Sequence, residues 1–456
     1  MKKILAIGCG GAGMFSLIVP AQLKKGKFQT TILSDEANIY CRCTTPYTIT
    51  GEARLKDAIQ PESLFTDYGF KIVHEKAINL NTDKKQVKTN KGHIFKYDYL
   101  VISTGAKPRI PNIKGLNLIN NAFTVRTSAD VVKIARFIKK GHQALIIGAG
   151  IIGLEMAGAL KKRGMKVSIV ERGPSISKHL ADPEFAQNII ANFKKHDIKI
   201  NFNSEILEIK KNKSKSATIL IRQGGKQASS LKANLIIIAA GVEPNLDIIK
   251  GTAIKANRRG ILVDREMHTN VKDVFACGDC CDPISAITHD NQPSELASSA
   301  IQQAKIVGFQ IAGYPIRYAG ATGAFAFQSL GKEYAGVGLT ETMARKKYKI
   351  VVCGQAETTN IYNDMLDKQP LKIKLIFAGL KLRLVGYEAF GNGVIASAEV
   401  ASFAIGLRLN ILSLLKYNYI SHPSLTPWPF MNPIIMATEA AMGQAMKEVK
   451  SLIKKI

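Results

Sequence analysis

The sequence of 456 residues has no run of 18 or more apolar residues, and it holds only seven cysteines and one tryptophan. Without such an apolar run, no transmembrane helix is expected. Seven irregularly spaced cysteines are too few for a secreted disulfide scaffold in a chain of this length. We therefore expect a cytoplasmic protein, and the length predicts several domains rather than one.

Acidic residues are also scarce, since 35 Asp and Glu stand against 63 Lys and Arg, which gives a net charge of +28. A nucleic-acid-binding protein would concentrate this charge in a tail or in a patch interleaved with aromatic residues. Here the lysines are spread over the whole chain, so no nucleic-acid partner is expected. We interpret the charge as a solvated Lys-rich surface or as a field that attracts an anionic substrate.

Glycine, by contrast, is plentiful and falls into two motifs. In "KKILAIGCGGAG" a short apolar run leads into Gly8, Gly10 and Gly13. In a dinucleotide-binding turn the first glycine permits the tight turn, the second lets the backbone approach a pyrophosphate, and the third lets helix and strand pack closely. The segment "FQTTILSDE" predicts the next strand, and Asp35 or Glu36 at its end is the candidate to bind the ribose hydroxyls.

The second motif is more complete. The segment "QALIIGAGIIGLEMAGALKKRGMKVSIVER" contains a strand, the glycines Gly148, Gly150 and Gly153, an amphipathic helix, a second strand and Glu171. These are the parts of a βαβ unit at the required spacing. A carboxylate at Glu171 would bind a ribose 2′-hydroxyl and repel a 2′-phosphate, which favours NADH over NADPH. The neighbouring Arg172 leaves NADPH open, because an arginine can hold that phosphate.

Two dinucleotide sites in one chain predict a flavin and a nicotinamide cofactor, and at this point the chain resembles the FAD-dependent pyridine nucleotide–disulfide oxidoreductases. Three more segments carry the resemblance. They are "YDYLVISTGAKP" with Thr104 and Gly105, "NLIIIAAGVEPN" with Gly241, and "TNVKDVFACGDC" with Gly278 and Asp279. The resemblance implies that the first two close the first FAD piece and the NAD domain, and that Asp279 bonds the ribityl chain of FAD.

The resemblance also implies the fold class: α/β, with two Rossmann-like (three-layer ββα) nucleotide-binding domains and a C-terminal α+β dimerisation domain. In the last domain "LKIKLIF" and "LRLVGYEAF" predict strands, "GVIASAEVASFAIGL" predicts an apolar helix, and a short Lys-rich helix is expected at the end. The expected segments are 1–118 for the first part of the FAD domain, 119–245 for the NAD(P)H domain, 246–323 for the second part of the FAD domain, and 324–456 for dimerisation.

The stretch "IYCRCTTPYTI" holds Cys41 and Cys43. "CTTPY" is similar to the catalytic loop of the single-cysteine branch of the family, which includes coenzyme A-disulfide reductases, NADH oxidases and persulfide or polysulfide reductases. Cys43 falls on the catalytic cysteine. Cys41 departs from that branch: it is a passive small residue, a partner of Cys43 in a strained disulfide, or a metal ligand. We predict that Arg42 binds the cofactor, and it is also a candidate to stabilise a Cys43 thiolate.

No metal is predicted, because Cys-x-Cys without a second ligand pair lacks the usual zinc spacing. By resemblance Tyr362 matches a catalytic tyrosine of coenzyme A-disulfide reductases, and Tyr419 matches a second one. His422 begins a His-Pro-Ser run similar to the His-Pro-Thr of the glutathione reductase branch, but Pro427 stands where that branch has the orienting glutamate. His422 is therefore either an acid–base catalyst or the cap of a Pro-rich turn.

Together these motifs imply an enzyme that passes hydride from NAD(P)H, with NADH favoured, through FAD to a small-molecule disulfide, persulfide or polysulfide at Cys43. A homodimer with a shared active site is expected, in which Tyr362 or His422 of the partner subunit protonates the departing thiol. Two alternatives remain open. One is an NADH oxidase or peroxidase with a sulfenic acid at Cys43, and the other is a flavoprotein that reduces a small carrier protein.

Overall fold

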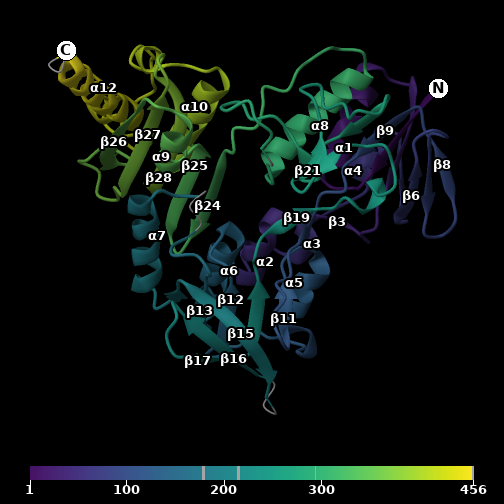
Figure 1. Cartoon of the computed structure of the whole chain (residues 1–456), viewed down its shortest axis with the longest axis horizontal. Helices are drawn as coiled ribbons and strands as arrows, with labels where there is room; N and C mark the ends of the chain where they lie inside the picture. Colours follow the sequence, from purple (N-terminus) through teal and green to yellow (C-terminus); the bar gives the residue numbers. More distant parts are fainter. Residues whose placement is uncertain (177–179, 213–215, 293, 454–456) are drawn as a thin grey trace. The chain divides into compact units, whose positions relative to one another are not determined.

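The computed structural model describes residues 1–456 except 177–179, 213–215, 293 and 454–456. The chain divides into two compact units, and each is described by itself (Figure 1). The first unit comprises Met1–Arg109, Arg126–Ala129 and Gly241–Ala321. The second comprises Ile110–Val125, Asp130–Ala240 and Thr322–Ile456. Among the helices of the described residues, none is both long enough and apolar enough to cross a bilayer.

The first unit is built on a parallel sheet in the order β22-β9-β1-β2-β5. Ile4–Ile7 of β1 are buried without alternation, because strands of such a sheet are covered on both faces. The helices α1 and α8 pack closely, and a Cβ placed on Gly308 would lie 2.7 Å from Val19 Cβ. The bounds are β1 Lys2–Ile7, α1 Gly11–Leu23, β2 Phe28–Leu33, β5 Phe70–Val73, β9 Tyr99–Ile102, β22 Val274–Ala276 and α8 Ala297–Ile311.

An antiparallel sheet of three strands, β6-β7-β8, adds the third layer of this unit. Its Leu80 and Val87 belong to the same hydrophobic core as β1 and α1. The smaller elements of the unit connect these layers. Their bounds are β3 Ile39–Tyr40, α2 Thr45–Thr50, α3 Leu55–Ala58, β4 Ile59–Gln60, α4 Ser63–Thr66, β6 Ala77–Asn81, β7 Gln86–Thr89, β8 Ile94–Lys96, β10 Ala106–Pro108, β19 Val242–Pro244, β20 Ala256–Asn257, β21 Gly260–Leu262 and β23 Cys281–Asp282.

The second unit repeats this design in its first half. A parallel sheet in the order β11-β18-β12-β13-β14 faces the antiparallel sheet β15-β16-β17, and Ile219 of that sheet shares a core with Leu145 and Ile236 of the parallel one. The bounds are β11 Ala122–Thr124, α5 Ser128–Ala135, β12 Gln143–Ile147, α6 Ile151–Lys162, β13 Lys166–Val170, α7 Pro183–Lys195, β14 Lys199–Asn201, β15 Ser204–Lys211, β16 Ala217–Gln223, β17 Ser229–Ala233 and β18 Leu235–Ile238.

The second half of this unit is an antiparallel sheet in the order β24-β25-β28-β27-β26. Helix α10 packs on β25 and β28, and α12 packs on β26 and β27 (Figure 1). The contact with α12 is close, since a Cβ placed on Gly354 would lie 1.8 Å from the carbonyl oxygen of Ala437. The bounds are β24 Phe325–Ser329, β25 Lys332–Gly338, α9 Glu341–Lys347, β26 Val351–Thr359, β27 Pro370–Ala378, β28 Arg383–Gly391, α10 Val394–Gly406, α11 Ile411–Leu414 and α12 Pro433–Ile453.

The predicted fold class is confirmed: two three-layer ββα domains and an α+β domain are present. The two strands and the apolar helix predicted in the last domain are confirmed as β27, β28 and α10. The prediction that the C-terminal helix is short is wrong, because α12 has 21 residues. Its first half buries Ile434, Ala437 and Ala441 against the sheet, and only the last turns carry the lysines. The residue boundaries of the four predicted segments stay a prediction.

Candidate active site

The first glycine motif forms the tight turn between β1 and α1. Gly8 has a φ of +109°, and a Cβ on it would lie 2.2 Å from the carbonyl oxygen of Ser103. A Cβ on Gly13 would lie 1.9 Å from the carbonyl oxygen of Gly8. A Cβ on Gly10, in contrast, would have Arg42 Nη1 at 3.8 Å as its nearest neighbour. Backbone packing therefore requires glycine at positions 8 and 13. Gly10 instead leaves room for the approach of a pyrophosphate.

Arg42 contacts both Glu36, which follows β2, and the glycine turn. Its Nη2 forms a salt bridge with Glu36, while Asp35 is exposed. The Nε atom of Arg42 is buried and has no hydrogen-bond partner among the described residues. An unpartnered buried donor on an arginine that borders Gly10 through Nη1 suits an anionic ligand, because a phosphate would satisfy it. A flavin dinucleotide thus fits this turn, and the choice between Asp35 and Glu36 for the ribose stays a prediction.

A second arginine, Arg126, lies in the same region. Burial and the neighbouring Arg42 lower the pKa of Arg126, and Asp279 acts in the opposite direction. Burial raises the pKa of Asp279, and the two arginines oppose that shift. The sequence does not single out Arg126, because one arginine in "TVRTS" belongs to no motif. Its Nη2 would lie 3.1 Å from a Cβ on Gly105, so it borders the predicted Thr-Gly turn.

The turn at Gly105 and the turn at Gly241, which were predicted to close the first FAD piece and the NAD domain, are joined directly. The short strands β10 and β19 pair in antiparallel fashion, immediately after Gly105 and Gly241. Asn245 N donates to the carbonyl oxygen of Gly105 at 2.8 Å, and Thr104 Oγ1 donates to that of Asn245 at 2.7 Å. Gly278 N donates to Gln303 Oε1 of α8 at 2.8 Å, which fixes the backbone before Asp279. The predicted cofactor residues of this unit therefore belong to hydrogen-bonded turns at the ends of the strands.

The second glycine motif has the same geometry. Gly148 has a φ of +106°, and a Cβ on it would lie 2.4 Å from the carbonyl oxygen of Ala239. A Cβ on Gly153 would lie 2.1 Å from the carbonyl oxygen of Gly148, whereas a Cβ on Gly150 would meet nothing within 4 Å. Open space at Gly150 is what the approach of a pyrophosphate requires. This turn therefore fits a second dinucleotide.

Glu171 lies beside this turn, as its spacing predicted. Its Oε2 accepts a hydrogen bond from Ala149 N at 2.9 Å, and its Oε1 accepts one from Gly173 N at 2.6 Å. These two bonds hold the carboxylate at the end of β13, next to the glycine turn. A fixed carboxylate in this place suits a ribose with a free 2′-hydroxyl.

Glu155, on the first turns of α6, is a further candidate to which none of the sequence motifs assigns a role. It lies two residues after Gly153 in an otherwise apolar stretch, which is the signal that could have identified it. Burial raises the pKa of Glu155 from its ordinary value of 4.5 to about 7. The carboxyl group therefore changes charge near neutral pH within the second dinucleotide-binding domain.

This shift predicts a pH-dependent effect on stability. Because the folded-state pKa is raised, the folded protein loses stability relative to an uncharged variant as the pH rises from about 4.5 through 7. We expect Glu155→Gln to stabilise the NADH-free protein at pH 8 by at most about 3 kcal/mol, and by much less at pH 5. Thermal unfolding at both pH values checks this. Glu399→Gln, at an exposed position of α10, is the control, and equal effects at both pH values would contradict the shift.

The cysteine loop lies in the first unit, in a 3₁₀ turn (Arg42–Thr44) that leads into α2. Cys43 is exposed and Cys41 is half-buried. Cys41 begins the turn: its N donates to the carbonyl oxygen of Ala58 at 2.8 Å, and its carbonyl oxygen accepts from Thr44 Oγ1 at 2.7 Å. All seven cysteines are thiols here. The passive, the disulfide-forming and the metal-ligand interpretations of Cys41 all stay predictions.

Tyr362 is held by a second segment of its own domain. Its hydroxyl group is 2.7 Å from Ser421 Oγ, and its N donates to the carbonyl oxygen of Pro423 at 3.0 Å. The Tyr362 ring packs edge-on against Trp428 with centroids 5.7 Å apart. Trp428 Nε1 in turn donates to Asp364 Oδ1 at 3.2 Å. The Pro-rich segment around His422 thus fixes the phenol.

Tyr419 and His422 belong to this same segment. Tyr419 donates its hydroxyl hydrogen to the carbonyl oxygen of Pro429 at 2.7 Å. His422 is exposed, and its Nδ1 lies 3.2 Å from Ser424 Oγ within the turn. That contact is what a turn-capping histidine makes, and the acid–base role stays a prediction. Cys43 lies in the first unit, and these side chains lie in the second.

Among the residues that the structure describes, one acidic group has the spacing of metal ligands, namely Asp182, Glu184 and Glu341. The ammonium group of the buried Lys374 lies within this group, 2.6 Å from each glutamate and 3.2 Å from Asp182. These contacts raise the pKa of Lys374 despite its burial. The lysine thus already supplies the positive charge that a metal ion would bring, and it links α7, α9 and β27.

Comparisons with known proteins agree with this geometry. Residues 2–304 match the family model described as pyridine nucleotide-disulphide oxidoreductase, and residues 324–429 match its dimerisation domain. An NADH oxidase of Methanocaldococcus jannaschii is 28% identical over 452 residues, which cover 96% of this chain and 98% of that protein. An NAD(P)H coenzyme A polysulfide/persulfide reductase of Pyrococcus horikoshii is 26% identical over 408 residues, 88% of this chain and 90% of the relative.

A solved structure of an NAD-dependent persulfide reductase from A. fulgidus superposes with a TM-score of 0.90 at 24% identity, and the match covers 98% of this chain and 84% of the other. At that identity the structure shows the fold alone. The family match covers well over half of the chain and includes both glycine turns. The chain therefore belongs to the pyridine nucleotide-disulphide oxidoreductase family and is an oxidoreductase that uses FAD and NAD(P)H.

Proposed function

We propose that the enzyme reduces low-molecular-weight sulfur compounds with NADH, and that Cys43 is the sulfur that meets the acceptor. The observation that carries this proposal is the exposure of Cys43. It is exposed in the turn before α2, whereas Cys277, Cys280 and Cys281 are buried in the core of the same unit. An accessible thiol on the FAD-binding unit can react with a small disulfide, and a buried thiol cannot.

The proposed reaction is balanced for each acceptor. With coenzyme A disulfide, NADH and one proton yield NAD⁺ and two molecules of coenzyme A. With a persulfide R–S–SH, NADH and one proton yield NAD⁺, the thiol R–SH and H₂S. When bound, FAD supplies the two-electron chemistry that links the nicotinamide to sulfur. The Pyrococcus relative, named for polysulfide and persulfide, and the net charge of +28 support an anionic acceptor of this kind.

We assign the following roles to the side chains. Cys43, as the thiolate, attacks the acceptor sulfur and releases its first thiol. Tyr362 of the partner subunit donates the proton to that departing thiol. We base the homodimer on the match of residues 324–429 to a dimerisation domain. Glu171, fixed beside the second glycine turn, favours NADH, and the seven thiols suit the reducing cytoplasm.

Steady-state assays under anaerobic conditions test the proposal. NADH oxidation is measured with coenzyme A disulfide, coenzyme A persulfide and polysulfide, and then in air without sulfur. We expect turnover with at least one sulfur acceptor to exceed turnover with oxygen by about tenfold or more. Faster turnover with oxygen or peroxide than with every sulfur compound would instead favour the NADH oxidase named in the Methanocaldococcus relative. In that reaction the exposed Cys43 would form a sulfenic acid.

The contacts that hold Tyr362, namely those with Ser421, Pro423 and Trp428, give a prediction for this reaction. Tyr362→Phe removes the proton donor, and we expect kcat for coenzyme A disulfide to fall about 100-fold. Ser421→Ala leaves the phenol in place but removes the hydroxyl 2.7 Å away that orients it, so kcat should fall about tenfold with little change in KM. Ser424→Ala, three residues further on, is the matched control. If the pH profile of kcat is the same in wild type and Tyr362→Phe, Tyr362 is not the donor.

A further inference from the structure

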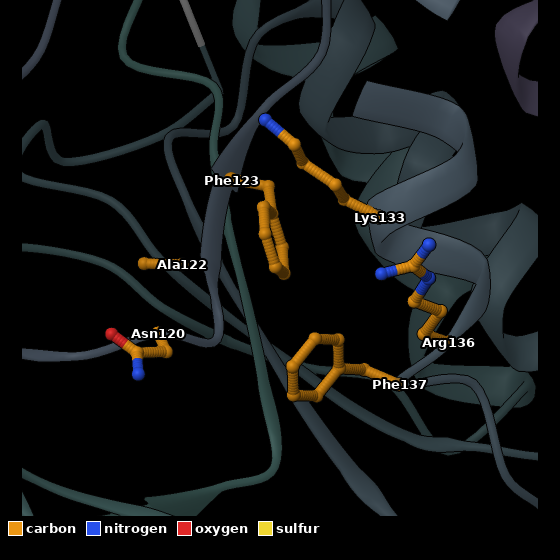
Figure 2. A pocket seen from close by; sticks show the side chains of 6 residues that line it. All are labelled: Asn120, Ala122, Phe123, Lys133, Arg136 and Phe137. Carbon is orange, nitrogen blue, oxygen red and sulfur yellow. The ribbon is translucent and has the colours of Figure 1, made fainter. Parts of the chain in front are cut away.

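A cavity of about 560 Å³ lies in the NAD-binding half of the second unit, between the edge strand β11 and the end of α5 (Figure 2). Its volume falls in the range of small-molecule sites. No carboxylate lines it within the part of the chain that the structure describes. The residues that line the cavity are Asn120, Ala122, Phe123, Lys133, Arg136 and Phe137.

Two aromatic rings form the apolar part of the cavity. The rings of Phe123 and Phe137 have centroids 5.3 Å apart and are tilted by 49°. Both side chains are half-buried, and Figure 2 shows both rings directed into the same space. Phe123 belongs to β11, the edge strand that pairs with β18. Phe137 follows α5, and its N donates to the carbonyl oxygen of Ile134 at 2.9 Å. Two half-exposed rings held by backbone hydrogen bonds are a platform on which a planar ring can stack.

Two cations stand beside these rings. Lys133 and Arg136 are exposed, and neither has an ion-pair partner in the described residues. In Figure 2 the guanidinium group of Arg136 points into the cavity and the side chain of Lys133 extends toward Phe123. Cations at the end of α5 also complement the helix dipole. The dipole does not explain why the cations and the two rings face one cavity.

The cavity is distinct from the second dinucleotide site. Strand β18 lies between β11 and β12 in the sheet, and the glycine turn follows β12. Asn121 immediately precedes β11, and its Nδ2 donates to the carbonyl oxygen of Asn234 at 3.0 Å, which fixes the start of the strand. Neither Glu171 nor any of the three glycines lines the cavity. A ligand here would therefore leave the NADH site available.

We propose that this cavity binds a nucleoside phosphate. The base stacks on Phe123 and Phe137, and the phosphate pairs with Arg136 and Lys133. Stacking on an aromatic side chain tolerates any base because every base has a π face, while an arginine fork matches phosphate geometry. The side-chain amide of Asn120 offers both a donor and an acceptor to the edge of the base. The proposal is independent of the acceptor that Cys43 meets.

Calorimetric titration with ADP tests this proposal. The protein carries FAD and is saturated with NAD⁺, so that both predicted dinucleotide sites are filled. We expect saturable binding of one ADP per chain below about 1 mM. Arg136→Ala and Phe137→Ala should each weaken this binding about tenfold. Lys195→Ala, which removes an exposed cation at the end of α7, is the matched control and should bind ADP normally.

Retained FAD content and NADH-dependent reduction establish that each variant is folded. Inorganic phosphate and adenosine, titrated separately, should each bind more weakly than ADP. The proposal is overturned by the absence of saturable binding, by displacement of ADP with NAD⁺, or by unchanged affinity in both Arg136→Ala and Phe137→Ala. It is also overturned if phosphate alone binds as tightly as ADP, because the two rings would then have no role.

Discussion

Replacing Cys43 with serine is expected to lower kcat/KM for coenzyme A disulfide or persulfide by about 1,000-fold or more, because a hydroxyl group cannot replace a thiolate in attack on sulfur. Reduction of the bound flavin by NADH should change by less than about twofold, since Cys43 lies outside the second dinucleotide-binding domain. Rapid mixing of the oxidised protein with NADH measures the first half-reaction. Rapid mixing of the reduced protein with the acceptor measures the second.

Cys41→Ser is the matched control, because it makes the same chemical change two residues away. If Cys41 is passive, this variant keeps both half-reactions. If Cys41 and Cys43 form a working disulfide, both variants lose the second half-reaction, and anaerobic titration of wild type with NADH shows two electrons beyond those held by FAD. A Cys43→Ser variant that reduces sulfur at the wild-type rate would contradict the role of Cys43 altogether.

Replacing Gly153 with alanine is expected to lower kcat/KM for NADH about 100-fold while the FAD content stays at one per chain. The added Cβ would lie 2.1 Å from the carbonyl oxygen of Gly148, so the glycine turn and α6 must separate. A displacement of about 1 Å at a site that positions a reactant costs roughly 100-fold in rate. Steady-state kinetics in NADH and the flavin absorbance of the purified variant measure the two effects.

Gly443→Ala in α12 is the control for this substitution, because a Cβ there meets nothing within 4 Å and the residue is likewise helical. It should change neither kcat/KM for NADH nor FAD content, and it should raise helix stability slightly. If Gly153→Ala binds NADH normally, the turn after β12 is not the nicotinamide nucleotide site. If Gly153→Ala loses FAD instead, the turn after β12 binds FAD and the assignment of the two cofactors to the two turns is wrong.

The sequence was most informative where glycines carry the site, because a glycine turn needs particular residues at fixed spacing. Gly8, Gly13, Gly148 and Gly153 all face backbone carbonyl oxygens at distances that exclude a side chain. The position of Glu171 also follows from its distance along one βαβ unit. These features are local in sequence, so a single chain without relatives is enough to find them.

The features that sequence reasoning missed depend on contacts between distant segments. Arg126 becomes a site candidate only because it is buried near Arg42 and Asp279, which lie far from it in sequence. The ion group around Lys374 joins α7, α9 and β27, and nothing in the strand "LKIKLIF" distinguishes this lysine from its neighbour Lys372. Likewise, the bond between Tyr362 and Ser421 spans 59 residues.

The most direct test of the central claim is whether reduced enzyme gives its electrons to sulfur. The protein is reduced anaerobically with one equivalent of NADH per FAD and then mixed with coenzyme A disulfide, while flavin absorbance and free thiol are followed together. We predict that the flavin is reoxidised without oxygen and that two thiols appear for each FAD. A flavin that stays reduced with disulfide, persulfide and polysulfide alike, and is reoxidised only when oxygen is admitted, would contradict this function.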